Sequence, residues 1–211
     1  MSDKMLDARS FFERRHTVET PSGRISYVEE GTGPTALFVH GVLLNGYLWR
    51  HQLARLGDIR RCIAVDLMAH GYTQVPANQD VSVTANAHML KEFLDALKID
   101  EVDLVGNDSG GGICQIFAAL YPERVRTLVL TNTDAHDNWP PEPFKPFVQM
   151  VAAGGLPDTL RAMVKDKAIY RSAQALGPAY RSTPAPSRCR RYRPTCLDLV
   201  GWEGRTGGRL C

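Results

Sequence analysis

The sequence predicts an α/β fold in which a mostly parallel β-sheet carries helices on both faces. Short apolar runs, typical of strands buried on both faces, alternate with helical patterns along the chain. This alternation is the signature of a parallel sheet built from right-handed crossovers. With 211 residues, 44% of them hydrophobic, the chain is long enough to bury one sizeable core.

The first predicted elements are a β-hairpin and two buried strands. Two stretches of alternating polarity, 12–19 and 24–30, flank the turn sequence Pro21-Ser22-Gly23, which is a hairpin signal. The continuous apolar runs 36–39 and 62–65 then predict strands with both faces covered.

The middle of the chain predicts two helices and two further strands. Apolar residues recur at helical spacing between Ser82 and Leu97, and Ser82 is a candidate N-cap. A strand at 102–105 is followed by a helix at 113–120 and a buried strand at 125–130. Because ligands bind at the carboxyl ends of parallel strands, the residues just beyond those ends should gather on one rim. These rim residues are His40, Gly41, Asp66, Asp108 and Asp134.

The organisation of the chain is predicted to change after residue 138. We expect a core domain over 1–138 and a partial helical cap over 139–180, introduced by a proline-rich connector. Helical patterns at 147–153 and 157–175 support the cap, which would lie over the rim.

The tail, residues 181–211, is basic and has no periodic pattern. Seven arginines stand against Asp198 and Glu203, so the tail carries a net charge of +5 and the remainder −3. Its richness in Arg, Pro, Gly and Cys predicts a disordered segment or translation in a different reading frame. The mildly acidic remainder gives no reason to expect a nucleic acid or an anionic membrane as partner.

Several functional classes are excluded by what the sequence lacks. Five cysteines include no Cys-x-x-Cys pair, and Cys62 and Cys114 lie in apolar patterns typical of buried residues. The N-terminus lacks the apolar region of a signal peptide, and no apolar run approaches the roughly 18 residues of a membrane span. We therefore expect a cytoplasmic protein without metal or cofactor.

The most informative motif is Gly106-Asn107-Asp108-Ser109-Gly110, which follows an apolar strand and precedes a helical pattern. This spacing is a nucleophile elbow, a strained strand-to-helix turn that exposes its central side chain. The outer glycines are needed because a Cβ there would strike the flanking strand or helix. A central aspartate predicts carboxylate attack on an alkyl carbon and an ester that water opens. The alternatives are that Asp108 only caps the helix, or that Ser109 is the nucleophile.

Four further motifs accompany the elbow. They are Phe38-Val39-His40-Gly41, Tyr47-Leu48-Trp49-Arg50, Asp66-Leu67-Met68-Ala69-His70-Gly71 and Tyr121-Pro122-Glu123-Arg124-Val125. With these motifs in this order, residues 24–180 resemble an α/β-hydrolase. The central aspartate resembles the branch of that family that contains haloalkane dehalogenases and epoxide hydrolases.

The resemblance implies a mechanism with named residues. Asp108 would attack the substrate, the backbone N–H groups of Val42 and Ser109 would form the oxyanion hole, and a histidine would activate water. No histidine occupies the expected place after an eighth strand, so we expect a C-terminally truncated relative, its last strands missing, that stalls as a covalent ester. His136 is the one candidate for a stand-in base. The alternative is a non-catalytic pseudoenzyme or binding module that keeps the pocket.

The substrate is predicted only as a small organic molecule, reacting with water. Haloalkane dehalogenases usually carry Asn and Trp where this chain has Val42 and Ser109, and epoxide hydrolases usually carry Pro where it has Leu43. Neither subfamily pattern is matched.

The remaining candidate residues each have a structural alternative. Asp134 follows the strand at 125–130 and is either the triad acid or a turn residue, and Asp137 is a weaker candidate of the same kind. Trp49 and Trp139 either line the substrate pocket or pack in the interior.

Overall fold

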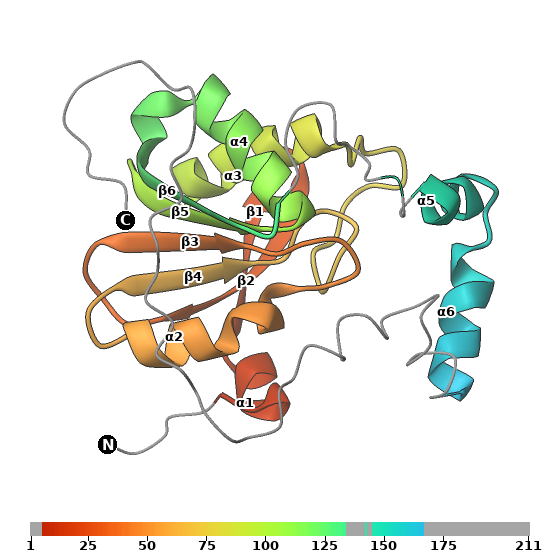
Figure 1. The fold of residues 1–211 in the computed structure, drawn as a ribbon. Helices are drawn as coiled ribbons and strands as arrows, with labels where there is room; N and C mark the ends of the chain where they lie inside the picture. The colour runs from red at the N-terminus through yellow and green to blue at the C-terminus, as the bar shows by residue number, and fades with distance from the viewer. Residues whose placement is uncertain (1–5, 134–141, 143–144, 167–211) are drawn as a thin grey trace. The chain divides into compact units, whose positions relative to one another are not determined.

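The computed structural model describes residues 6–133, 142 and 145–166. Two compact units divide the chain, one containing residues up to 136 and one containing residues 137–199. The described part of the first unit is built on a six-stranded sheet with the order β1-β2-β4-β3-β5-β6 (Figure 1). Its strands are β1 (Arg15–Thr20), β2 (Gly23–Glu30), β3 (Thr35–Val39), β4 (Arg61–Val65), β5 (Val102–Asn107) and β6 (Val125–Thr131).

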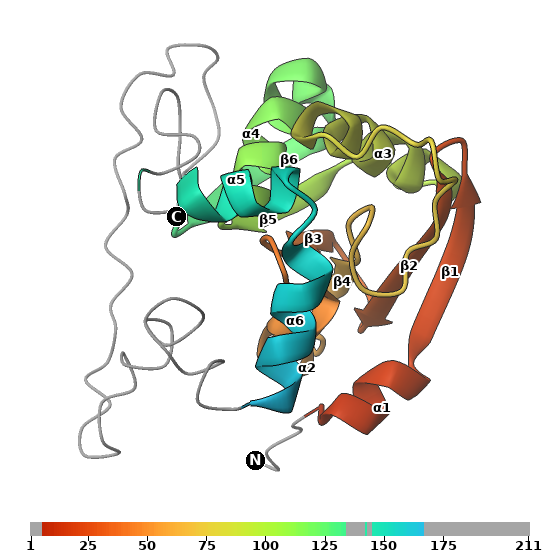
Figure 2. The ribbon, with the colours of Figure 1, turned by 90° about the vertical axis from the view of Figure 1, so that its right-hand side faces the viewer.

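The strand directions confirm the predicted mostly parallel sheet. Strands β4, β3, β5 and β6 pair in parallel, whereas the β1–β2 hairpin joins β4 through an antiparallel pairing. Figure 2 shows this long hairpin at one edge of the sheet. The carboxyl ends of the four parallel strands therefore lie on one rim.

Helices cover both faces of the sheet, as the sequence predicts (Figure 1). In β3, Leu37 and Val39 face a core that includes α3 (Val83–Ala96) and α4 (Ser109–Leu120). The alternate residues of β3 face a second core. That core includes Ala36, Phe38, side chains of α1 (Ala8–Glu13) and α2 (Arg50–Leu56), and Trp49 at the end of the short 3₁₀ helix η1 (Gly46–Trp49).

Helix α3 begins where the sequence predicts. Its N-cap is Ser82, whose hydroxyl accepts a hydrogen bond from the Ala85 N–H at 3.2 Å. A second 3₁₀ turn, η2 (Pro122–Arg124), leads from α4 into β6.

Two predicted boundaries in the first unit were wrong. The first strand begins at Arg15, because the preceding residues form α1, which Asp7 caps through the Ser10 N–H at 2.8 Å. Helix α4 begins at Ser109, four residues before the predicted start at Ile113, and so includes three consecutive glycines. The close packing of Gly110 and Gly111 outweighs the low helix propensity of the segment.

The second unit contains two described helices. Helix α5 spans Lys145–Ala152 and helix α6 spans Leu156–Lys165, close to the two helical patterns in the sequence. Helix α6 ends earlier than predicted, because Asp166 already adopts an extended conformation. The predicted division into a core over 1–138, a cap over 139–180 and a tail over 181–211 stays a prediction.

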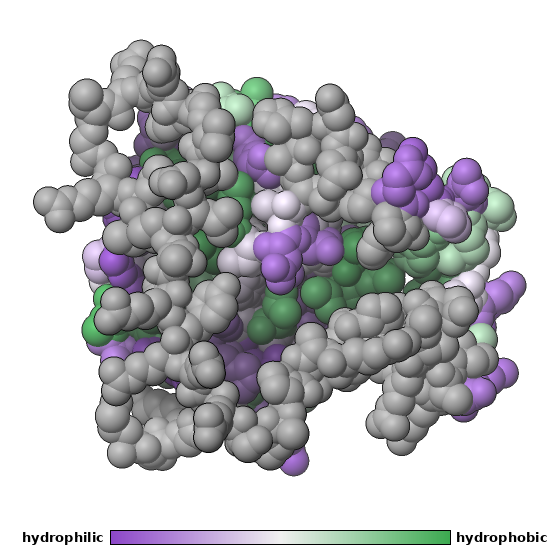
Figure 3. All heavy atoms as spheres, in the orientation of Figure 1, coloured by the Kyte–Doolittle hydropathy of each residue, from purple (hydrophilic) through white to green (hydrophobic). Residues whose placement is uncertain are grey.

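The surface of the first unit includes an edge strand. Within the described sheet β6 pairs only with β5, and most of its residues are partly exposed. Hydrophobic and hydrophilic side chains are mixed on the face seen in Figure 3. Every helix in the part of the chain that the structure describes is too short or too polar to span a lipid bilayer.

Candidate active site

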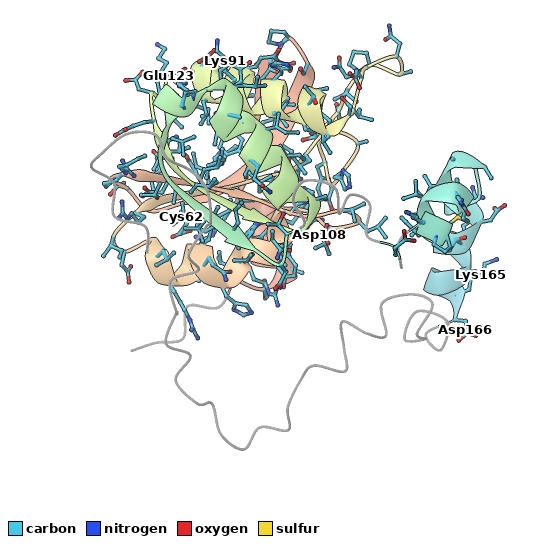
Figure 4. All side chains as sticks on the ribbon, turned by 45° about the horizontal axis from the view of Figure 1, so that its top comes forward. Cys62, Lys91, Asp108, Glu123, Lys165 and Asp166 are labelled. Carbon is cyan, nitrogen blue, oxygen red and sulfur yellow. The ribbon has the colours of Figure 1, made fainter. Side chains whose placement is uncertain are left out.

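The elbow residue Asp108 has the strained backbone that the motif predicts. It lies between β5 and α4 with φ 55° and ψ −131°, a conformation that non-glycine residues rarely adopt (Figure 4). Such strain costs on the order of 1–3 kcal/mol and persists only where the surroundings hold it. The Asp108 N–H donates to the Thr131 carbonyl at 3.2 Å, and the Asp108 carbonyl accepts from the Thr133 hydroxyl and the Gly111 N–H, each at 2.9 Å.

The glycines around Asp108 leave no room for side chains. A Cβ at Gly106 would lie 2.7 Å from the Gly111 Cα, and a Cβ at Gly110 would lie 2.2 Å from the His40 carbonyl oxygen. This confirms the steric reason given for both outer glycines of the motif. Gly41 is equally constrained, because its Cβ would lie 2.5 Å from the Asp108 Cβ. Sequence reasoning missed this contact between distant residues.

Two backbone N–H groups converge on one oxygen of the Asp108 carboxylate. Oδ1 accepts from the Val42 N–H at 3.3 Å and also from the Ser109 N–H. Val42 lies in the loop after β3 and Ser109 is the first residue of α4, so two parallel strand ends supply the donors. Among the described residues, none donates a hydrogen bond to the other oxygen, Oδ2. The structure thus brings together three of the predicted site residues.

The loop that carries Val42 is tied to the loop after β4 by two buried side chains. The His40 ring bonds backbone atoms on both sides: Nε2 accepts from the Leu67 N–H at 3.0 Å, and Nδ1 lies 2.8 Å from the Gly41 carbonyl. Asp66 accepts from the Gly46 N–H at 2.8 Å and pairs with Arg15 at 2.7 Å. His40 and Asp66 therefore order the loops that follow β3 and β4.

Burial keeps the His40 ring neutral. The ring is 0% exposed, and its removal from water lowers its pKa from 6.5 to about 4. Because Nε2 faces an N–H donor and Nδ1 faces a carbonyl, the neutral ring carries its proton on Nδ1. His40 is therefore saturated as a hydrogen-bonding group.

The other candidate residues are less directly placed. Trp49 is only 6% exposed and its ring packs against Phe38 with centroids 5.2 Å apart, which favours the packing alternative. Asp134 and Trp139 lie outside the described residues, as do the weaker candidates Asp137 and His136.

The described residues offer neither a histidine base hydrogen-bonded to Asp108 nor a metal site. No histidine in the described part of the chain hydrogen-bonds to the Asp108 side chain. Burial raises the pKa of the thiols of Cys62 and Cys114, which makes them poor nucleophiles. Within the same residues, no group of three or more His, Cys, Asp or Glu side chains is arranged to hold a metal ion.

Known proteins resemble this chain over about half of its length. The chain is 36% identical over 115 residues to haloalkane dehalogenase 2 of Mycobacterium bovis. The aligned residues are 54% of this chain and 40% of that protein. The haloalkane dehalogenase DatA of Agrobacterium tumefaciens C58 matches with a TM-score of 0.52 at 30% identity, covering 56% of this chain and 40% of that one. An epoxide hydrolase mutant of Vigna radiata matches with a TM-score of 0.50 at 33% identity, covering 55% and 37%.

The chain therefore spans about 40% of the length of the curated dehalogenase that it matches. A family model covers much more of the chain, since the alpha/beta hydrolase fold matches residues 34–194. That match includes β3 to β6, the elbow and the loop that carries Val42. With this match over most of its length, the chain belongs to the alpha/beta hydrolase fold family.

Proposed function

We propose that this protein is a hydrolase in which Asp108 attacks a small organic substrate and forms a covalent ester. One observation carries the proposal: the Asp108 Oδ1 atom already occupies the pair of N–H donors from Val42 and Ser109. In an aspartate mechanism the tetrahedral intermediate forms on the carboxyl carbon of the enzyme itself. Its oxyanion is then an oxygen of Asp108, and the donors must hold that oxygen.

A serine mechanism fits this geometry poorly. A serine nucleophile needs an empty pair of donors for the carbonyl oxygen of the substrate. Here the aspartate carboxylate fills that place, and the strained φ of the elbow belongs to Asp108. Ser109 follows the elbow as the first residue of α4 and contributes its N–H. We therefore assign the nucleophile to Asp108 and the oxyanion hole to the N–H groups of Val42 and Ser109.

The proposed reaction has two steps. Asp108 Oδ2 attacks a saturated carbon, the new C–O bond replaces the bond to the leaving group, and that group departs with the electron pair. Water then attacks the Asp108 Cγ and gives a proton to a base, while the oxyanion at Oδ1 is held by the two N–H groups. Collapse of this intermediate releases an alcohol and restores the carboxylate. In sum, a halide R–X and water become R–OH, X⁻ and a proton. With an epoxide the leaving oxygen stays attached to the substrate and takes up the proton, so the epoxide and water become a diol.

The second step depends on a base. General base catalysis contributes typically 10²–10⁴-fold, and no described histidine reaches the Asp108 side chain. We therefore expect the ester to accumulate in this chain. Asp134 remains our candidate for the acid that would orient a base, and Trp139 our second candidate for the pocket wall.

The substrate class is proposed from chemistry shared by the relatives. Haloalkane dehalogenases and an epoxide hydrolase are among the similar proteins, and both names describe substrates with an electrophilic saturated carbon. Val42 and Ser109 carry no side-chain N–H to hold a departing halide. We expect reactive alkyl halides and epoxides to alkylate Asp108, without ranking the two classes.

The test is covalent labelling. The 211-residue protein is incubated with 1-bromobutane or 1,2-epoxybutane, and intact mass and peptide mapping locate any adduct. We expect one stable addition at Asp108, none in Asp108→Asn, and unchanged labelling in Ser109→Ala, which keeps its backbone N–H. Labelling at Ser109, or equal labelling of the Asp108→Asn variant, would overturn the assignment. Saturable binding by a monodisperse protein without any adduct would support the pseudoenzyme alternative.

A further inference from the structure

The orientation of the Val42 N–H depends on a single peptide plane. The carbonyl of Gly41 and the N–H of Val42 belong to the same planar trans unit, so they point in opposite directions. The N–H reaches Asp108 Oδ1 at 3.3 Å. Whatever holds the Gly41 carbonyl on the other side therefore fixes the direction of this donor.

Two groups hold the Gly41 carbonyl. The His40 Nδ1–H donates to it at 2.8 Å, and the Leu44 N–H donates to it at 3.3 Å across a tight turn. The turn itself is strained, because Leu43 has φ 60°, a left-handed conformation that disfavours a bulky side chain. A strained turn with one long hydrogen bond holds a peptide plane weakly, so the shorter bond from His40 is the main constraint.

The His40 ring is anchored at its far end. Nε2 accepts from the Leu67 N–H at 3.0 Å, two residues beyond the end of β4. The ring is completely buried, and the His70 ring packs beside it with centroids 5.3 Å apart. The His40 carbonyl is also fixed, because α4 passes so close that Gly110 cannot carry a Cβ. The ring thus spans from the rigid end of β4 to the peptide that precedes Val42.

We propose that His40 is a positioning residue that aims the Val42 N–H at Asp108 by holding the Gly41 carbonyl with its Nδ1–H. This inference rests on the proposed function, because it concerns the same donor pair. It assigns a task to each ring nitrogen: Nε2 anchors the ring on the backbone after β4, and Nδ1–H orients the oxyanion donor. His40 touches no reacting atom and acts only through this peptide.

Two conservative variants separate the tasks of the two nitrogens. His40→Asn places an amide N–H near the position of Nδ1, so the donor to Gly41 is kept and the anchor to Leu67 is lost. His40→Gln places an amide oxygen near the position of Nε2, so the anchor is kept and the donor is lost. If His40 had a purely structural role, the ester decay and amide exchange of each variant would follow only its loss of stability. Thermal unfolding measures that loss.

The first readout is the decay of the alkyl ester. Each variant is labelled with 1-bromobutane and freed of reagent, and loss of the adduct is followed by intact mass at pH 9. Loss of one oxyanion donor costs about 10²–10³-fold, so we expect misorientation in His40→Gln to slow decay on the order of 10- to 100-fold. His40→Asn should stay within about threefold of the unchanged protein. Equal decay of both variants, or slower decay of His40→Asn, overturns the proposal.

The second readout needs no chemistry. Amide hydrogen exchange measured by NMR reports whether the Val42 N–H stays bonded in the resting protein. We expect exchange at Val42 to rise about tenfold or more in His40→Gln and to change little in His40→Asn. Unchanged protection in His40→Gln refutes the positioning role. If the protein without a substitution forms no adduct, the proposed function is refuted instead. The hydrogen exchange of the Val42 N–H then tests the positioning role separately.

Discussion

Two aspartates at opposite ends of β5 show what separates a structural carboxylate from a reactive one. Asp103 lies near the start of β5 and Asp108 directly follows its end. Asp103 pairs with Arg126 at 2.6 Å and Arg60 at 2.9 Å, and accepts from the Thr127 hydroxyl at 2.7 Å. From the residues that the structure describes, the Asp108 carboxylate receives only backbone N–H groups, and only at one oxygen.

The electrostatics follow from this difference. Burial alone would raise the pKa of Asp103, but hydrogen bonds from Arg126 and Thr127 outweigh it and hold that pKa below its ordinary value. An oxygen saturated by cations has no lone pair available for attack on carbon. The same strand therefore carries an ion-pair network at one rim of the sheet and an open carboxylate oxygen at the other.

The largest expected effect comes from adding a side chain at Gly110, where α4 packs against the His40 carbonyl oxygen. In Gly110→Ala the new Cβ would lie 2.2 Å from the His40 carbonyl oxygen, so backbone must shift. We expect a loss of at least about 3 kcal/mol in the free energy of unfolding, and no labelling of Asp108. Urea denaturation measures the first and intact mass the second.

Gly112, two residues further along α4, is the matched control. A Cβ at Gly112 meets nothing within 4 Å, so Gly112→Ala should stabilise α4 by about 0.5–1 kcal/mol and leave labelling unchanged. Equal damage from the two alanines would show that helix propensity, and not the contact with His40, sets the cost.

Acid should weaken the loop that carries Val42. The folded protein keeps His40 neutral with a pKa of about 4, whereas the unfolded chain titrates near 6.5, so the unfolded state binds more protons between these values. The contribution of His40 is thus complete above pH 6.5 and is lost as the pH falls towards 4. We expect a loss of up to about 3 kcal/mol from this group.

The groups that face the His40 ring are His70, which lowers its pKa, and Asp66, which raises it, both less than burial does. Urea denaturation at pH 7, 5.5 and 4.5 checks the slope. In His40→Asn the curve should flatten between pH 6.5 and 4. A slope that is unchanged in this variant would assign the effect to other groups.

Breaking the ion-pair network should cost stability without touching the site. Asp103→Asn leaves Arg126 and Arg60 without their shared carboxylate, and we expect a loss of about 1–3 kcal/mol with labelling of Asp108 unchanged. Asp158→Asn removes an exposed pair with Arg161 in α6 and should stay within about 0.5 kcal/mol. Reduced labelling in folded Asp103→Asn would mean that the two rims are coupled.

The sequence identified the elements that depend on local signals. Strands β3 to β6, the cap of α3 and the elbow at Asp108 all follow from short patterns of hydrophobicity and turn residues. The start of α4 did not: the apolar pattern placed it at Ile113, whereas the helix begins at Ser109, where Gly110 packs against the His40 carbonyl oxygen. The contact between Gly41 and Asp108 was equally hidden, since it joins residues 67 positions apart.

The start of the chain shows a different limit. The alternating polarity at 12–19 predicted a strand, yet Asp7 caps a helix that runs from Ala8 to Glu13. The cap residue Asp7 was present in the sequence. The polar–apolar alternation of the six-residue strand β1, however, continued by chance into the last residues of α1. Period alone cannot separate the two over so few residues.

The smallest expected effect comes from removing a single threonine hydroxyl that hydrogen-bonds to one of the two aspartates. Thr133 donates to the Asp108 carbonyl at 2.9 Å, and Thr127 donates to the Asp103 carboxylate at 2.7 Å. Each Thr→Val change removes one hydroxyl at constant shape and should cost about 0.5–1.5 kcal/mol. Only Thr133→Val should also slow labelling, by a few fold, because it loosens the strained peptide of the elbow. The Gly111 N–H still holds that carbonyl at 2.9 Å, which limits the loss. Equal labelling rates in the two valine variants would mean that the backbone bonds to Gly111 and Thr131 suffice to hold the nucleophile.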